Sequence, residues 1–351
     1  MFQILHDVNI DWLGHRKWFI GASVLLMLVG LGSAVFRQAT GRQAFNLGVD
    51  FKGGTVVTTR FRQKPDDDAI RKALTAKGVG DAVVQPVTDR PDTVLIKVPL
   101  EGEGQDGRAK VKDALNTFGA EAQPGKEIDA DPNAAYKIVG TDAVGAIAGA
   151  QLRNKAIAVT LAALVGILIY IAFRFEWTFG AAAVIAVFHD VLVTLGFFSI
   201  FQWEVGLTVI AALLTLVGFS VNDTIVVFDR IRENRKLHRR DSLYKVTNDS
   251  INQTLSRTVI ANGLVFLSVL AMVLFGGDVL RAFSLALFIG VIFGTYSSIA
   301  VASPIMVWWE QRIEAANRES ALSFNQPRVM KASGAVKGGK PKLRDASKPL
   351  H

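Results

Sequence analysis

The sequence has no cysteine among its 351 residues, which excludes disulfide bonds, thiolate catalysis and cysteine-ligated metal sites. Charged residues are also scarce, at 20%, whereas 50% of the chain is hydrophobic. A mean hydropathy of +0.31 is high for a soluble protein. The composition therefore predicts an integral membrane protein that carries one soluble part.

Motifs for nucleotide binding and for acyl transfer are missing. The glycine-rich stretch GVDFKGG (Gly48–Gly54) lacks the Lys-Ser or Lys-Thr ending and the helix of a P-loop, and no G-x-G-x-x-G follows a strand. A nucleophile elbow is missing as well. We therefore expect no enzyme activity and no cofactor.

Six apolar runs reach the length of about 20 residues that a helix needs to cross a bilayer. No cleavable signal peptide is expected, because the first run is long and has no small-residue cleavage site before a mature domain. Tryptophans lie at or near the run ends, as interfacial anchors do. The runs are 18–36, 156–173, 178–200, 205–228, 258–275 and 281–309, and the tryptophans are Trp18, Trp177, Trp203, Trp308 and Trp309.

The net charge of +8 is concentrated in short loops and a tail beside these runs. With six spans, the segments richest in Lys and Arg fall on one side, which the positive-inside rule makes cytoplasmic. The segment 1–17 and the basic tail 310–351 are then both cytoplasmic. The tail is rich in Ser, Gly, Pro and Lys, so we expect it to be largely disordered after about Ala321. It is either simply solvated or in contact with anionic lipid or the ribosome.

A polar insert, residues 37–155, separates the first span from the remaining five in 156–309. It predicts an external α+β domain with the order β-α-β-β-α-β, which is that of a ferredoxin-like, split βαβ unit. We expect a binding or coupling domain, because its charged faces show no paired-carboxylate or triad spacing. The expected strands are 54–61, 82–88, 93–100 and 134–140, and the expected helices are 66–78 and 106–119.

Asp223 lies near the end of the fourth run, where insertion of a carboxylate costs about 2.5 kcal/mol or more. Residues three or four apart share a helix face, so Asp223 shares a stripe with Ser220. Asn222 lies close by, and Thr224 points further outward. Small and polar residues beside an acid indicate a face packed against other helices. An acid kept at this depth points to proton handling.

Arg257 begins the fifth run, and Asn262 lies a turn and a half deeper. Antiparallel packing of the fourth and fifth spans would place Arg257 at the depth of Asp223. A nearby arginine favours the charged carboxylate, whereas burial favours the neutral acid. The residues leave two interpretations open, a proton relay and a static ion pair that fixes helix packing.

His189 and Asp190 lie in the middle of the third run. They either shuttle protons or form an interhelical hydrogen bond that orients the span. The runs contain no further His or Glu at ligand spacing, so we expect no metal site. The small residues of GTYSS (Gly294–Ser298) in the last run fit close helix packing or, second, the polar lining of a path.

Four stretches carry a family pattern: FNLGVDFKGGT (Phe45–Thr55), VGFSVNDTIVVFDRIREN (Val217–Asn234), INQTLSRT (Ile251–Thr258) and ALFIGVIFGTYSSIAVASP (Ala286–Pro304). With the six spans and the first external loop, they resemble the SecF half of the bacterial SecD/SecF family, which assists Sec protein export. That family belongs to the resistance-nodulation-division superfamily of proton-driven transporters. The resemblance covers nearly the whole chain except the tail.

The resemblance implies that Asp223 and Arg257 serve proton flow together with an acid of SecD, and that the external domain holds or pulls emerging polypeptide. It carries over no role for His189 or Asp190. It also implies an inner-membrane translocase subunit that acts late in export, driven by the proton-motive force. Its implied partners are SecD, the SecYEG translocon with YajC and YidC, the translocating polypeptide and membrane lipid, without nucleic acid. A proton-coupled exporter of lipid or small molecules and a structural scaffold are the alternatives.

Overall fold

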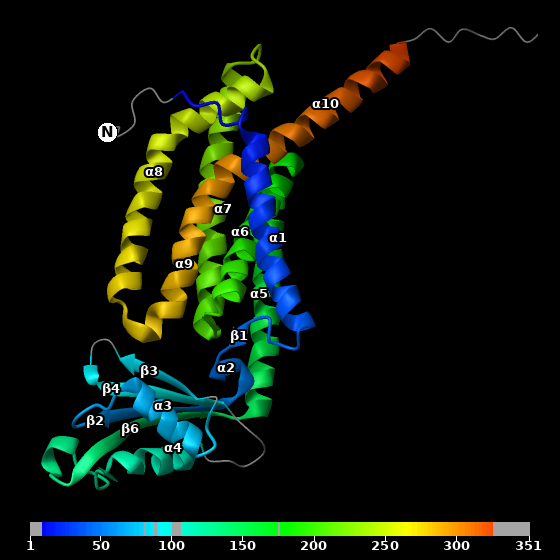
Figure 1. Ribbon diagram of the computed structural model, residues 1–351. Helices are drawn as coiled ribbons and strands as arrows, with labels where there is room; N and C mark the ends of the chain where they lie inside the picture. The colour runs from blue at the N-terminus through cyan, green and yellow to red at the C-terminus, as the bar shows by residue number, and fades with distance from the viewer. Residues whose placement is uncertain (1–8, 81, 88–89, 100–106, 175, 326–351) are drawn as a thin grey trace, which may run out of the picture. The chain divides into compact units, whose positions relative to one another are not determined.

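The computed structural model describes residues 9–80, 82–87, 90–99, 107–174 and 176–325 (Figure 1). The chain divides into two units, Met1–Glu310 and Gln311–His351. The first unit contains the helical bundle and the α+β domain. Of the second unit, the described residues are helical.

The six predicted spans are confirmed as long apolar helices, each long enough to cross a membrane. Several extend beyond the predicted runs, and the last helix continues to Asn325, so the expected disorder does not begin at Ala321. The remaining tail lies outside the described residues. The helices are α1 (Arg16–Ala39), α5 (Ala146–Arg174), α6 (Trp177–Phe201), α7 (Leu207–Leu237), α8 (Leu243–Phe275) and α9 (Gly277–Ser297), and α9 continues through a π-helical turn, η3 (Ser298–Ala302), into α10 (Ser303–Asn325).

Helices α6, α7 and α9 form the centre of the bundle, since half or more of the residues in the most apolar segments of these three spans are buried. Helices α1, α5 and α8 bury far less and expose large apolar side chains, such as Leu28, Val159 and Leu264. Apolar side chains of this kind meet acyl chains in a bilayer. Helices α1, α5 and α8 therefore present apolar side chains to the lipid.

Two glycines let α1 approach the central helix α6 closely. A Cβ atom added at Gly30 would lie 2.6 Å from the Cα atom of Gly196, well inside van der Waals contact. Small residues at such crossings bring helix backbones together where no hydrophobic effect holds helices to each other. Nearer the N-terminal end of α1, the Tyr296 hydroxyl of α9 donates to the backbone oxygen of Phe19, 2.7 Å away.

The α+β domain has the predicted order of strands and helices. Strands β3, β4, β2 and β6 lie side by side in that order and pair antiparallel, as a split βαβ unit requires (Figure 1). A short strand, β5, adds to β6 in parallel and was not predicted. The elements are β2 (Gly54–Phe61), α3 (Asp67–Ala76), β3 (Val83–Val87), β4 (Arg90–Pro99), α4 (Gly107–Leu115), η1 (Asn116–Phe118), β5 (Ala120–Glu121), η2 (Ile128–Ala130) and β6 (Ala134–Val144).

The core of this domain lies between the sheet and the two helices. Leu74 of α3 and Val111 of α4 pack in one cluster with Ile96 and Tyr136 of the sheet, so both helices cover the same face. The Tyr136 hydroxyl lies 3.2 Å from the backbone oxygen of Lys112 and 2.9 Å from Oδ1 of Asn116, so its one proton has two acceptors within reach. A buried hydroxyl whose proton has an acceptor costs little to bury.

We predict a pH dependence that comes from Tyr136. Burial, and then the charge of Glu121, raises the pKa of Tyr136 from 10.0 to about 12. The phenol of the unfolded chain ionises first, so the stability that Tyr136 contributes is complete below pH 10 and is lost as the pH rises towards 12. The Tyr136→Phe variant should lack this loss in thermal unfolding. The tyrosinate absorbance of the wild type minus that of the variant measures the ionisation directly, and a midpoint near pH 10 would contradict the prediction.

Candidate functional site: a buried pair of aspartates

Two aspartates lie inside the bundle, on two of its central helices. Asp190 of α6 has no exposed surface, and Asp223 of α7 is 5% exposed. They are close enough for their charges to interact. Isolated charges are very costly to bury, so the groups around them decide what this site does.

The Asp223 carboxylate is bound by α9 and α8. The Ser298 hydroxyl donates to its Oδ2 atom at 2.7 Å. The Asn262 amide lies within hydrogen-bonding reach of it and also donates to the Thr295 hydroxyl at 2.9 Å. These partners are neutral dipoles, so Asp223 has hydrogen bonds but no counter-ion among the described residues.

The Asp190 carboxylate has three hydrogen-bond partners. The hydroxyls of Ser220 and Ser297 donate to its Oδ2 atom at 2.6 and 2.8 Å. The Nδ1 atom of His189 lies 2.9 Å from the other oxygen, Oδ1. The Nε2 atom of His189 is buried and has no hydrogen-bond partner among the residues that the structure describes. Asp190 is thus the better satisfied of the two acids.

A π-helical turn lets neighbouring serines serve different acids. Ser298 begins the turn η3, directly after Ser297, and the Ser303 hydroxyl donates to the backbone oxygen of Ser298 at 2.9 Å. Single π-helical turns inside α-helices are rare and are frequent at functional sites. Gly294, one turn earlier, faces the cluster, since a Cβ atom there would lie 3.7 Å from Asp190 Oδ2, at ordinary van der Waals distance.

The expected ion pair between Asp223 and Arg257 is not formed. The Arg257 side chain is exposed and makes no ion pair with a described acid. The reason is the direction of the helix face. Successive residues of an α-helix are about 100° apart, so Arg257 points away from the buried face that carries Thr258 and Asn262.

Some of the other predicted site residues bind one of the two acids, and the rest do not. Asn262 lies within hydrogen-bonding reach of Asp223, whereas Ser220 binds Asp190 and not the acid on its own helix. Asn222 is exposed on the bundle surface. Thr224 is buried but donates only to the backbone oxygen of Ser220. His189 bonds to its neighbour Asp190, so the interhelical bond expected from this pair is made by Asp190 alone.

Ser297 and Ser298 are the site residues that the sequence reasoning did not single out. The GTYSS stretch predicted close packing or a polar lining, and its two serines prove to be the hydrogen-bond donors to the two acids. Their spacing from the acids in sequence carries no signal, because they lie more than 70 residues away. Among the residues that the structure describes, no group of three or more His, Cys, Asp or Glu is placed to hold a metal ion.

The N-terminal end of α7, the helix that carries Asp223, is bonded to the segment before the α+β domain. Asp50 lies in a short helix, α2 (Val49–Lys52), and its Oδ2 atom accepts from the backbone N–H of Leu207 at 3.1 Å. An acid there satisfies one of the free N–H groups at a helix start and complements the helix dipole.

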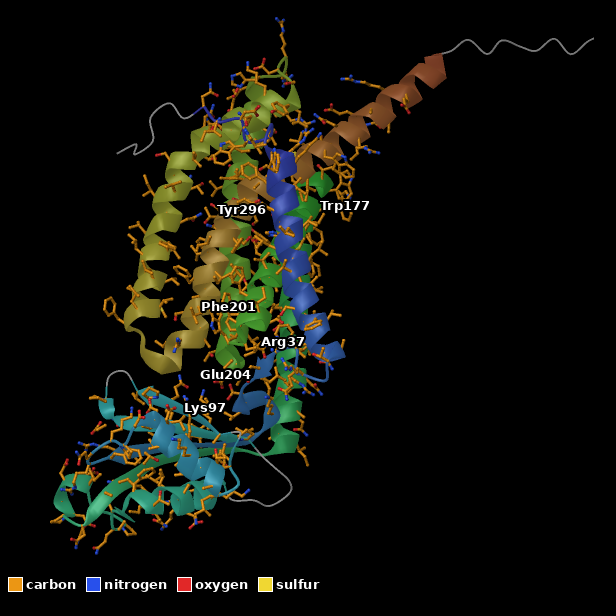
Figure 2. All side chains as sticks on the ribbon, viewed as in Figure 1. Arg37, Lys97, Trp177, Phe201, Glu204 and Tyr296 are labelled. Atoms are coloured by element: carbon orange, nitrogen blue, oxygen red, sulfur yellow. The ribbon has the colours of Figure 1, made fainter. Side chains whose placement is uncertain are left out.

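Two further contacts join the segment 37–155 to the connection between α6 and α7. Strand β1 (Asn46–Leu47) pairs in parallel with β7 (Glu204–Val205), which lies between α6 and α7. Lys97 of β4 lies 2.6 Å from Glu204 in an ion pair, and Figure 2 shows the two side chains pointing toward one another. A movement of α7 therefore has a direct connection to the domain.

The fold and the site together define a class: a polytopic helical membrane protein with an acid-containing core and an α+β domain between its first two spans. A family model described as protein export membrane protein SecD/SecF, C-terminal, matches residues 126–312, and one for the SecD/SecF GG motif matches residues 41–65. The chain therefore belongs to the SecD/SecF family of protein export membrane proteins, and it is a multi-pass membrane protein.

Individual relatives place it beside the SecF members. It is 38% identical over 379 residues to the protein translocase subunit SecF of Koribacter versatilis, covering 88% of this chain and 94% of that one. It is 38% identical over 300 residues to SecF of Pseudomonas aeruginosa, covering 86% and 91%. The crystal structure of SecDF, a translocon-associated membrane protein from Thermus thermophilus, matches with a TM-score of 0.71 and 37% identity, covering 89% of this chain and 40% of that one.

Proposed function

We propose that this chain is a SecF-type subunit of the protein translocase that uses the proton-motive force in late steps of protein export, without enzymatic chemistry of its own. The observation that carries the proposal is Asp223, a buried membrane acid whose described partners are all neutral. Such an acid can gain and lose a proton without breaking an ion pair, and intramembrane acids of this kind mark proton paths.

The route from the proton to the polypeptide runs along α7 in this proposal. Asp223 and Leu207 are 16 residues apart on one helix, which is about 24 Å at 1.5 Å per residue. A change in charge at Asp223 alters its bonds to Ser298 and Asn262, and a resulting shift of α7 reaches Asp50 and the α+β domain. The domain would then move emerging polypeptide away from the membrane.

We further propose SecD as the partner that completes the site. The relative from Thermus thermophilus is a fused SecDF chain, of which this chain covers 41%. Asn222 is exposed on α7, one residue from the acid, and a polar side chain facing lipid is costly. A partner helix that covers Asn222 and Arg257 would remove this cost and bring Arg257 into the site. SecYEG, with YajC and YidC, would supply the channel and its accessory subunits.

The proposed location is the bacterial inner membrane, with both termini cytoplasmic and residues 37–155 periplasmic. The charge distribution supports this orientation, since Arg230, Arg235 and Lys236 follow the fourth span and the hairpin at Gln202–Glu204 has no basic residue.

Export into inverted membrane vesicles tests the proposal. Vesicles that contain SecD are prepared with and without this chain, and proton and sodium gradients are set independently. We expect the chain to raise the yield of completed export only when a proton gradient is present. Stimulation that is equal with the gradient collapsed would contradict proton coupling, and stimulation by a sodium gradient alone would change the coupling ion.

A further inference from the structure

We propose that the His189–Asp190 pair is a second proton-binding site of this chain, and that the two serines at the start of the π-helical turn join it to Asp223. This inference rests on the proposed function, because it adds a site to the same proton path. It concerns residues for which the family resemblance implied no role.

The first argument is the arrangement of the pair. A histidine and a carboxylate that are both buried and 2.9 Å apart share one hydrogen bond, and a proton can lie on either partner. The pair is more deeply buried than Asp223, with His189 at 3% and Asp190 at 0% exposure. A purely structural hydrogen bond at this depth needs only one polar group on each helix. Here both hydrogen-bonded groups, the imidazole of His189 and the carboxylate of Asp190, are ionisable.

The second argument is the free Nε2 atom of His189. A buried nitrogen that lacks a hydrogen-bond partner is destabilising, because it has lost its bonds to water without gaining others. A histidine whose other nitrogen is held by Asp190 and whose Nε2 is free has one position from which a proton or a water molecule enters. That position is not used by any described residue.

The third argument is the connection to Asp223. Ser297 donates to Asp190, and the next residue, Ser298, donates to Asp223. Both acids thus depend on the conformation of the same π-helical turn. Their charges also repel each other when both are ionised, so a proton bound by one weakens the need for a proton on the other.

Among the described residues of the elements packed against α6, Asp223 is the one ionisable residue at the depth of the His189–Asp190 pair. The Lys, Arg, Asp and Glu residues of α1 and α5 lie in the first or last turns or outside the apolar run, as do those of α9. The turn η3 has no ionisable residue, and Tyr296 of α9 faces α1. Protonation forms one O–H bond on a carboxylate oxygen and breaks one O–H bond of hydronium, which is left as water.

Infrared difference spectra of the full-length chain in lipid nanodiscs, recorded over a series of pH values, test the inference. We expect a protonated-carboxyl band that changes with pH and is lost in Asp190→Asn. In Asp223→Asn the same band should remain, with a proton affinity about tenfold lower because the repelling charge is gone. In Ser297→Ala the band should shift in frequency, which supports the assignment even if Asp190→Asn fails to fold.

The matched control is Thr194→Val, since Thr194 is buried on the same helix and donates only to the backbone oxygen of Asp190. It should leave the band unchanged. The inference is overturned if Asp190→Asn removes no pH-dependent band, or if the band responds to sodium at constant pH and not to pH. Export assays keep the two proposals apart. Normal export by Asp223→Asn would contradict the proposed function while a titrating Asp190 band still stands.

Discussion

The Asp223→Asn variant is expected to assemble normally and to lose all export that depends on the proton gradient. Asparagine is close in shape to aspartate and still accepts the hydrogen bond from Ser298, which is 2.7 Å long in the wild type. It cannot gain or lose a proton. The measurement is the yield of completed export into inverted vesicles, and we expect the yield to fall to that of wild-type vesicles whose gradient has been collapsed.

A matched variant on the same helix separates this loss from general damage to α7. Thr215→Val removes a hydroxyl that donates only to the backbone oxygen of Ala211, 2.9 Å away, and should retain wild-type export. The amount of Asp223→Asn protein in the membrane, and its co-purification with SecD, should equal those of the wild type. Undiminished gradient-dependent export by Asp223→Asn would remove the basis of the proton proposal.

The Gly54→Ala variant is expected to destabilise the α+β domain by about 2–4 kcal/mol. A Cβ atom at this position would lie 2.5 Å from the backbone oxygen of Val98, and Gly54 has a φ of +153°. Neither strand can retreat easily, because Gly54 and Thr55 pair with Pro99 and Val98 in the β2–β4 ladder. The clash is therefore with backbone that the sheet holds in place.

Amide hydrogen exchange of β2 and β4 in the full-length chain measures this effect. A loss of 2 kcal/mol reduces protection about 30-fold, since 1.4 kcal/mol is a factor of ten. Gly78→Ala serves as the control, because Gly78 also has a positive φ, +77°, but nothing lies within 4 Å of an added Cβ atom. It should cost about 1 kcal/mol. Equal protection in Gly54→Ala and Gly78→Ala would show that the contact with Val98 does not matter.

These variants bear on function in different ways. Asp223→Asn removes the proposed proton acceptor and leaves the domain intact. Gly54→Ala leaves the acid intact and weakens the domain where the chain enters its first long strand, two residues after α2. Because Asp50 of α2 binds the start of α7, we expect a smaller secondary loss of export in Gly54→Ala that remains sensitive to the gradient.

Much of the fold was predictable because its signals are local. The length of an apolar run decides whether a helix can span a bilayer, and this is visible without any partner. The split βαβ order followed from short periodic segments ended by glycines such as Gly78 and Gly119, both with positive φ. The helix extensions at the start of α8 were not predicted. The polar residues there, including Asn248, are buried against the segment near Ile10, which lies more than 200 residues away.

The sequence by itself determined that an acid stands at Asp223 and a histidine–aspartate pair at His189 and Asp190, since ionisable residues are conspicuous in apolar runs. Only the tertiary structure decided which groups these acids bind. Ser297 and Ser298 are contributed by another helix, through a π-helical turn that no local pattern announced, and Arg257 is directed away by the helical turn of 100° per residue. The identity of a residue is local, whereas its partners depend on how helices distant in sequence pack together.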